Sequence, residues 1–254
     1  MELGLRSRRV LVTGASEGIG LACAHAFARE GADVVIVSRR PAPLAEAATD
    51  IQSKHGVNVQ ICAADLSTDE GQRRVADASD DIDILINNAG SIPHGDLQSI
   101  TDETWRRAWN LKVFGYVNLC RLIMPKLEAR GQGVVVNVIG AAAVRHRPGY
   151  IAGAAGNSAL HAMTEALGSD SMRRGVRVVG VNPGLVATGR MEALLRAQAP
   201  ERGLSPDDWR QLIPQDPPPA QPEDIADVVV FLASDRAGHV SGDVLTVDAG
   251  RHLR

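Results

Sequence analysis

Lysine is nearly absent from this chain, and its few copies are unevenly placed. Only Lys54, Lys112 and Lys126 are lysines among the 254 residues, so no ammonium side chain follows Lys126. Aromatic residues are also scarce, at 3% of the sequence, and Tyr116 and Tyr150 are the only tyrosines. Chemistry that needs a lysine in the second half of the chain is therefore excluded, and a phenol can come from only two positions.

Cysteines and long apolar runs are scarce as well. Cys23, Cys62 and Cys120 are odd in number and far apart, which fits neither a disulfide framework nor a metal-ligand spacing. No apolar run approaches the ~18–20 residues that cross a bilayer, and Met1–Arg9 lacks the apolar stretch of a signal peptide. We therefore expect a cytoplasmic protein with reduced cysteines, no metal site and no membrane segment.

The charge balance gives no sign of a nucleic-acid partner. Net charge is −3 and the isoelectric point is about 6.2, whereas nucleic-acid binders carry a basic field. A hydrophobic fraction of 44% favours a globular chain that can bury a core. The length fits one domain over residues 1–254.

Short runs rich in Val, Ile and Leu alternate with longer segments of helical pattern. Runs this continuous are typical of strands buried on both faces. The alternation predicts a Rossmann-like α/β domain, a doubly wound parallel sheet of about seven strands with helices on both faces. The predicted strands are Arg9–Thr13, Val34–Ser38, Val57–Cys62, Ile82–Asn87, Val134–Ile139, Val176–Val181 and Val244–Val247. The predicted helices are Ile19–Glu30, Pro43–Lys54, Thr68–Ala78, Thr101–Arg130, Ile151–Arg174 and Pro222–Ser234.

One segment departs from this alternation. Residues 189–221 lie between the sixth strand and the next core helix, and they end in a proline-rich stretch. Helical patterns occur near Met191–Gln198 and Asp207–Leu212. An insertion at this place predicts a substrate lid within the domain rather than a second domain.

A glycine-rich loop follows the first predicted strand. Residues 14–20 read Gly-Ala-Ser-Glu-Gly-Ile-Gly and run directly into a helix. Glycines let the backbone turn tightly and approach a pyrophosphate, and a helix N-terminus offers free N–H groups and a favourable dipole. The strand, loop and helix together predict dinucleotide binding.

The spacing Gly-x-x-x-Gly-x-Gly after Thr13 resembles the short-chain dehydrogenase/reductase superfamily, and the resemblance extends along nearly the whole chain. Further matches are Asp65 after the third strand, Asn87–Gly90, Asn110 within Trp109–Lys112, Asn182–Thr188, Pro222–Ala226, Phe231–Ser234, Gly242 and Val247–Gly250. The resemblance implies a small-molecule substrate and a nicotinamide cofactor. The implied cofactor residues are Gly14, Ser16, Glu17, Gly18, Ile19, Gly20, Ser38, Arg39, Arg40, Asp65, Leu66, Asn88, Ala89, Gly90, Asn157, Pro183, Gly184, Val186 and Thr188.

The residues after the second strand bear on the choice of cofactor. NAD enzymes usually carry an acidic residue there to grip the ribose hydroxyl. This chain has Ser38, Arg39 and Arg40 instead, and an arginine pairs well with a 2′-phosphate. NADP is favoured, with NAD as the alternative because Glu17 places a negative charge near the phosphate loop.

The family pattern breaks at its catalytic residues. The resemblance implies a serine after the fifth strand and a Tyr-x-x-x-Lys pair at the start of the next helix. A gapless alignment puts Gly140, Gly153 and Asn157 in these positions. The alternative places Tyr150 in the tyrosine position, but it leaves Ala154 at the lysine position and supplies no serine.

Other groups could supply the proton. The resemblance places His94 on a loop facing the nicotinamide, and His146 and Tyr150 lie on the loop before the Gly153 helix. Asn110 matches the family's asparagine that helps place an active-site water. We expect an atypical oxidoreductase that uses Asn110, Tyr150, His146 or His94 for carbonyl or alcohol chemistry.

Two other functions stay open. The loss of all three catalytic side chains also fits a non-catalytic nucleotide-binding subunit or sensor that assembles with a competent paralogue. Nothing in the chain directly favours a third reading, a non-redox reaction on the same fold. The family resemblance implies a homodimer or homotetramer formed through Thr101–Arg130, Ile151–Arg174 and the C-terminal strand.

Overall fold

The computed structural model describes residues 2–254 and contains one sheet of seven parallel strands in the order β3-β2-β1-β4-β5-β6-β7. The strands are β1 (Arg9–Thr13), β2 (Asp33–Ser38), β3 (Val59–Ala63), β4 (Ile84–Asn87), β5 (Gly133–Val138), β6 (Val176–Pro183) and β7 (Val244–Val247). The central strands are buried along nearly their whole length, as their Val and Ile content requires. The predicted doubly wound fold is confirmed.

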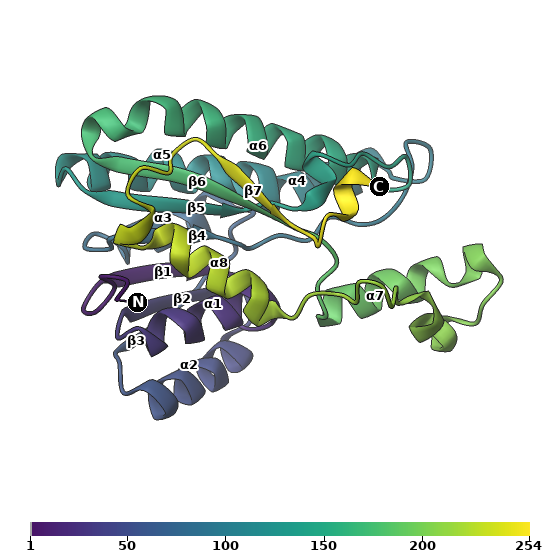
Figure 1. The fold of residues 1–254 in the computed structure, drawn as a ribbon, viewed down its shortest axis with the longest axis horizontal. Coiled ribbons are helices and arrows are strands. Elements are labelled where there is room, and N and C mark those ends of the chain that lie inside the picture. The colour runs from purple at the N-terminus through teal and green to yellow at the C-terminus, as the bar shows by residue number, and fades with distance from the viewer. Residues whose placement is uncertain (1) are drawn as a thin grey trace.

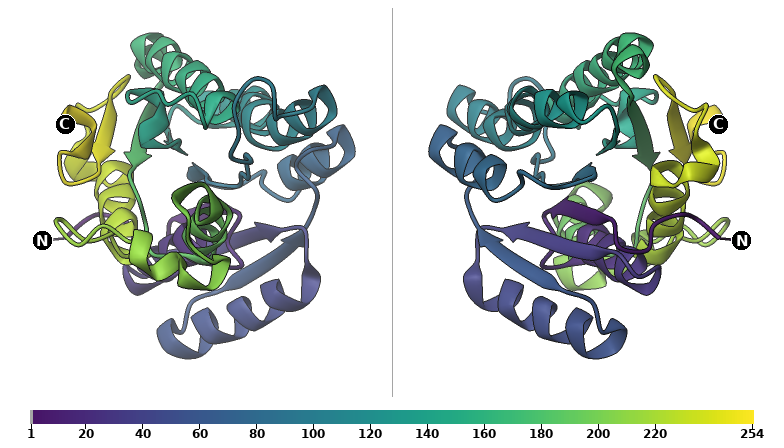
Figure 2. Two further views of the ribbon diagram at one scale, coloured as in Figure 1. Left: turned by 90° about the vertical axis from the view of Figure 1, so that its right-hand side faces the viewer. Right: turned by 90° about the vertical axis from the view of Figure 1, so that its left-hand side faces the viewer.

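Helices cover both faces of the sheet (Figures 1 and 2). The helices α1 (Gly18–Arg29), α2 (Pro41–His55) and α8 (Pro222–Ala233) pack on one face, where Phe27, Ile36 and Val229 share a core. The other face carries α3 (Asp69–Asp77), α4 (Asp102–Trp109), α5 (Gly115–Ala129) and α6 (Ile151–Ser171). Among residues 2–254, no helix is both long enough and apolar enough to cross a membrane.

The segment predicted as one helix from Thr101 to Arg130 is interrupted. A π-helical turn over Asn110–Phe114 separates α4 from α5. Such turns add a residue to the helix, rotate the side chains that follow and often occur at functional sites. The interruption therefore changes which side chains of this segment face the sheet.

Residues 189–221 project from the body of the domain (Figure 1). The helix α7 (Gly189–Gln198) packs on a 3-10 helix (Pro206–Leu212) around its own apolar cluster of Met191, Leu195 and Trp209. The segment leaves and returns through a narrow neck, where Val186 and Ala220 form a parallel bridge. This arrangement lets the segment pack internally with few contacts to the core.

The carboxyl ends of the parallel strands share one edge of the sheet. β1 lies between β2 and β4, and the helices that follow β1 and β4 lie on opposite faces. Folds of this kind bind ligands in the crevice created at such a switch point.

Candidate active site

The glycine loop adopts a backbone shape that glycine favours. Gly14 and Gly18 have φ of 67° and 58°, in the left-handed region. Gly20 is packed so closely that a Cβ there would lie 2.2 Å from the Gly14 carbonyl oxygen. Glu17 precedes α1 without a side-chain cap, so the first N–H groups of the helix remain available for an anion.

Hydrogen bonds join this loop to the end of β4. The Thr13 hydroxyl accepts from the backbone N–H groups of Asn88 (2.8 Å) and Ala89 (3.0 Å). The Asn88 amide donates to the Thr13 carbonyl at 2.9 Å. These contacts hold the ends of β1 and β4 together in one rim.

A pocket of about 420 Å³ opens along this rim. It extends from the end of β2 to the end of β5, and residues of α7 lie over it. The predicted cofactor residues that line it are Gly14, Ser16, Glu17, Gly18, Ile19, Ser38, Arg39, Arg40, Leu66, Asn88, Ala89, Gly90, Pro183, Gly184, Val186 and Thr188.

Three other predicted cofactor residues lie outside the lining. Gly20 lies where α1 packs closely on the Gly14 backbone, which leaves no room for a side chain. The Asp65 carboxylate accepts from the Ser67 N–H and hydroxyl, at 2.9 and 2.7 Å, while its neighbour Leu66 lines the pocket. Asn157 is buried behind Gly140.

The end of β2 is positively charged and exposed. Arg40 forms a long 3.5 Å ion pair with Glu17. Arg39 is exposed, and within residues 2–254 no carboxylate lies in ion-pair range of it. A free guanidinium beside Ser38 thus stands at the end of the pocket where a ribose phosphate would lie.

The two glycines that the sequence analysis aligned with the family's serine and tyrosine lie against other side chains. Gly140 has φ of 145°, and a Cβ there would meet the Asn157 amide nitrogen at 2.9 Å. The Tyr150 ring covers Gly153, since a Cβ at Gly153 would lie 2.0 Å from Tyr150 Cε1. The space that a side chain at position 153 would enter is therefore filled by the tyrosine three residues earlier.

The predicted proton donors do not line the pocket. The rings of His94 and Tyr150 are stacked with centroids 6.1 Å apart. His146 is exposed, and its Nε2 lies 3.1 Å from both the Ala143 carbonyl oxygen and the Ser158 hydroxyl. Asn110 is also exposed, at the start of the π-helical turn. Asn110 therefore lies on the exposed side of its helix, outside the lining of the pocket.

A lysine that was not predicted as a site residue lies in the pocket instead. The Lys112 side chain is 8% exposed and lines the pocket. Its Nζ donates to the Ile139 carbonyl oxygen at 2.6 Å, at the carboxyl end of β5. Burial lowers the pKa of Lys112 to about 7, and the nearby Arg190 guanidinium acts in the same direction.

Helical periodicity could have found this lysine. Ala108, Lys112, Tyr116 and Leu119 are buried along one stripe of the segment. Asn110 is two residues before Lys112, about 200° around a regular helix. The inward stripe therefore excludes Asn110 and includes Lys112.

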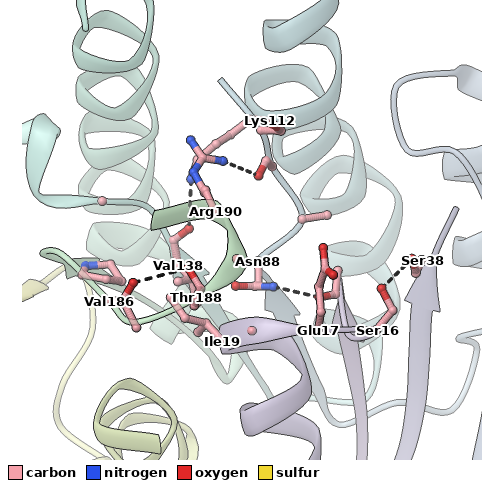
Figure 3. Close-up of a pocket in the computed structure, with 18 of the residues that line it drawn as sticks. Ser16, Glu17, Ile19, Ser38, Asn88, Lys112, Val138, Val186, Thr188 and Arg190 are labelled. Atoms are coloured by element: carbon pink, nitrogen blue, oxygen red, sulfur yellow. Dashed lines mark hydrogen bonds between the residues drawn. The ribbon is translucent and has the colours of Figure 1, made fainter. Parts of the chain in front are cut away.

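Arg190 joins the α7 segment to the pocket. Its guanidinium donates to the carbonyl oxygens of Gly90 (2.8 Å) and Ile92 (3.2 Å), and to the Tyr150 hydroxyl (2.9 Å). Figure 3 shows Arg190 and Lys112 at the same end of the pocket. The sequence predictions missed Arg190 as well, because nothing local distinguishes it from a solvent-exposed arginine.

The fold and the glycine-lined crevice define a dinucleotide-binding α/β protein. Comparison with protein families finds that the short chain dehydrogenase family matches residues 8–199. The chain belongs to this family.

Characterised relatives match nearly the whole chain. A 7alpha-hydroxysteroid dehydrogenase of Escherichia coli is 30% identical over 259 residues, covering 98% of this chain and 95% of the relative. A galactitol 2-dehydrogenase (L-tagatose-forming) of Cereibacter sphaeroides is 32% identical over 241 residues, covering 94% of this chain and 92% of the relative.

Solved structures agree with the fold. L-sorbose reductase from Gluconobacter frateurii, solved with NADPH and L-sorbose, superimposes with a TM-score of 0.92 and 32% identity, covering 100% of both chains. A putative NAD(P) dependent gluconate 5-dehydrogenase from Beutenbergia cavernae with bound NADP gives a TM-score of 0.89 and 33% identity, again over 100% of both chains.

Proposed function

We propose that the protein is an NADP(H)-dependent oxidoreductase that transfers a hydride to or from a carbonyl or alcohol, with another group in place of the family's tyrosine. The observation that supports this most strongly is the retained pocket. Its cofactor loops remain in place although Gly140, Gly153 and Asn157 occupy the aligned catalytic positions. Holding two reactants together is worth roughly 7–11 kcal/mol of a barrier, so a pocket of this kind can catalyse once it has a proton donor.

The residues of the pocket fit a dinucleotide phosphate. The uncapped start of α1 offers N–H groups for the pyrophosphate, and Arg39 stands free for a ribose phosphate. Bound NADPH would supply the hydride, while the chain holds the cofactor and orients the carbonyl. The NADPH in the sorbose reductase structure and the NADP in the gluconate dehydrogenase structure support the same choice.

Calorimetric titration with NADPH and NADH tests the cofactor assignment. Arg39→Asp should weaken NADPH binding roughly tenfold to hundredfold and change NADH binding far less, because a charge-assisted hydrogen bond is worth ~1.5–3 kcal/mol. Arg73→Asp is the matched control, since Arg73 is exposed on α3 and outside the pocket. Equal binding of both cofactors before and after Arg39→Asp would refute the assignment.

Activity is tested by following NADPH oxidation with a panel of carbonyl compounds. The panel should include ketoses and ketosteroids, because sorbose reductase, galactitol dehydrogenase and hydroxysteroid dehydrogenase are among the relatives. Turnover of any member supports the proposal. Tight NADPH binding with no turnover across the whole panel would refute it.

The second candidate is a non-catalytic nucleotide-binding subunit or sensor. The φ of 145° at Gly140 and the ring packed over Gly153 favour it, because both positions are built without the family's side chains. Purification from the native host should then yield a second family member with serine, tyrosine and lysine intact. Repeated isolation of this chain alone would argue against that role.

We also propose that residues 189–221 form a lid, because Arg190, Met191 and Leu194 lie over the pocket.

A homo-oligomer and a cytoplasmic location remain predictions. Phe114 and Leu245 are exposed apolar side chains near the helices and strand expected at the interface. Sedimentation analysis should show a dimer or tetramer, and a monomer at all concentrations would contradict it.

A further inference from the structure

A buried ammonium group without an acidic partner lies in the pocket, beside the carboxyl end of β5. The Lys112 stem passes over Gly90, where an added Cβ would lie 2.6 Å from Lys112 Cδ. Its Nζ reaches the Ile139 carbonyl oxygen, one residue before Gly140. Within residues 2–254 no carboxylate lies in ion-pair range of this nitrogen. Burying an amine without a counter-charge destabilises a fold, so structural stability does not explain this lysine.

The hydrogen bonds of Lys112 leave it able to contact a ligand. An ammonium group has three N–H donors. The Ile139 carbonyl oxygen accepts at 2.6 Å, and the Val138 carbonyl oxygen makes a longer contact of 3.5 Å. At least one N–H therefore remains for an atom in the pocket that Lys112 lines.

The groups facing Lys112 favour easy release of its proton. Burial, and to a smaller extent the positive charge of Arg190, lower the pKa of Lys112 to about 7. The Tyr116 ring lies 5.7 Å from Nζ, and its hydroxyl donates to the Val138 carbonyl at 2.8 Å. Burial raises the pKa of Tyr116, so this phenol stays neutral and its proton is already engaged. A donor that titrates near the working pH is the most effective general acid.

We propose that Lys112 is the proton donor to the substrate oxygen, in place of the family's tyrosine; this inference rests on the proposed function. In the reducing direction the carbonyl carbon gains the hydride of NADPH. The oxygen keeps the π electron pair and takes a proton from the Lys112 ammonium, which gives an alcohol, NADP⁺ and a neutral amine. The amine regains its proton from water. The reverse sequence oxidises an alcohol, with the Lys112 amine as base.

The other candidates are less well placed. Tyr150 lies over Gly153, and its hydroxyl accepts a hydrogen bond from Arg190. His94 and His146 lie outside the lining of the pocket. Lys112 alone among these combines a free donor with a place in the lining.

The small number of lysines permits a direct test of the titration. Protein labelled isotopically at lysine Cε should give three signals in a heteronuclear NMR spectrum. One signal should titrate near pH 7, disappear in Lys112→Met and shift on addition of NADP⁺. Titration of all three signals at roughly pH 10, the ordinary lysine range, would overturn the proposal without any activity measurement.

Kinetics on the intact enzyme provide the second test. Lys112→Met should lower turnover by about 10²–10⁴-fold, the usual contribution of a positioned acid, while NADPH affinity stays within a few-fold of the wild type. Lys112→Arg should not restore activity, because a guanidinium with a pKa above ~12 does not release its proton. Lys54→Met, at an exposed lysine outside the pocket, is the matched control.

The outcomes separate this inference from the proposed function. An active wild type with an equally active Lys112→Met variant overturns only the assignment of Lys112. If Tyr150→Phe then abolishes turnover, Tyr150 is the donor. A wild type that binds NADPH but reduces no compound of the panel overturns the proposed function and this inference together.

Discussion

Replacing Lys112 by methionine should change how stability depends on pH. The substitution exchanges a buried amine for an apolar chain of similar length. In the folded protein burial holds the pKa of Lys112 at about 7, against 10.5 for an ordinary lysine. Between these two values the unfolded chain binds a proton that the folded chain has released. The free energy of unfolding of the wild type therefore gains a term that rises with pH across this window.

The size of the effect follows from the two pKa values. Each pH unit with a full proton difference contributes about 1.36 kcal/mol. Because the folded amine is still half-protonated at pH 7, the gain from pH 7 to pH 9 is roughly 2 kcal/mol rather than the full two-unit value. The Ile139 carbonyl favours the ammonium form and makes this figure an upper bound. In Lys112→Met the term is absent.

Urea unfolding of both proteins at fixed protomer concentration and several pH values provides the assay. Every other titratable group is common to both proteins, so its contribution cancels in the difference. The free energy of unfolding of the wild type, relative to that of the variant, should increase steadily as the pH rises from about 7 to about 9. Parallel stability curves would show that Lys112 has an ordinary pKa and would refute the reasoning.

Two further variants test other parts of the pocket. Arg190→Met should speed NADPH release roughly fivefold, equivalent to ~1 kcal/mol of hydrogen bonding, and should expose residues 189–221 to proteolysis. Arg202→Met, at an exposed position outside the pocket, is the control. If Arg190→Met changes neither NADPH release nor cleavage, the lid proposal is contradicted. Gly140→Ser should destabilise the protein by ~1–3 kcal/mol in urea unfolding without raising activity, because it combines a φ of 145° with crowding by Asn157. Gly131→Ser, at a left-handed glycine with open space around it, should lower the free energy of unfolding by less. An equal or larger decrease for Gly131→Ser would show that crowding does not cause the destabilisation of Gly140→Ser.

The fold could be derived from the sequence because its signals are local. Continuous Val and Ile runs, helical periodicity and a glycine loop lie within single elements, and each predicted strand occurs in the sheet. The cofactor loops also come from short motifs at strand ends, which a parallel sheet brings to one edge. The prediction of seven strands with helices on both faces needed no long-range information.

The end of the pocket that holds Lys112 and Arg190 could not be derived from short motifs in the same way. Matching on the short Trp109–Lys112 motif selected Asn110, while the helix face and the π-helical turn place Lys112 inward. The sequence excludes the family's second-half lysine, and the absence of any lysine after Lys126 shows this directly. Helical spacing alone puts Lys112 on the same stripe as Tyr116, but the contact of that stripe with the end of β5 depends on how the elements pack.

Contacts between distant parts of the chain decided the rest. Lys112 meets the end of β5 through Ile139, and Arg190 on α7 meets Gly90, one hundred residues earlier. The Tyr150 ring occupies the space beside Gly153, although sequence alignment offers these two residues as alternatives. Burial, the lowered pKa of Lys112 and the contact of α7 with the pocket arise only when the separate elements pack together, since each depends on surroundings that no single segment contains.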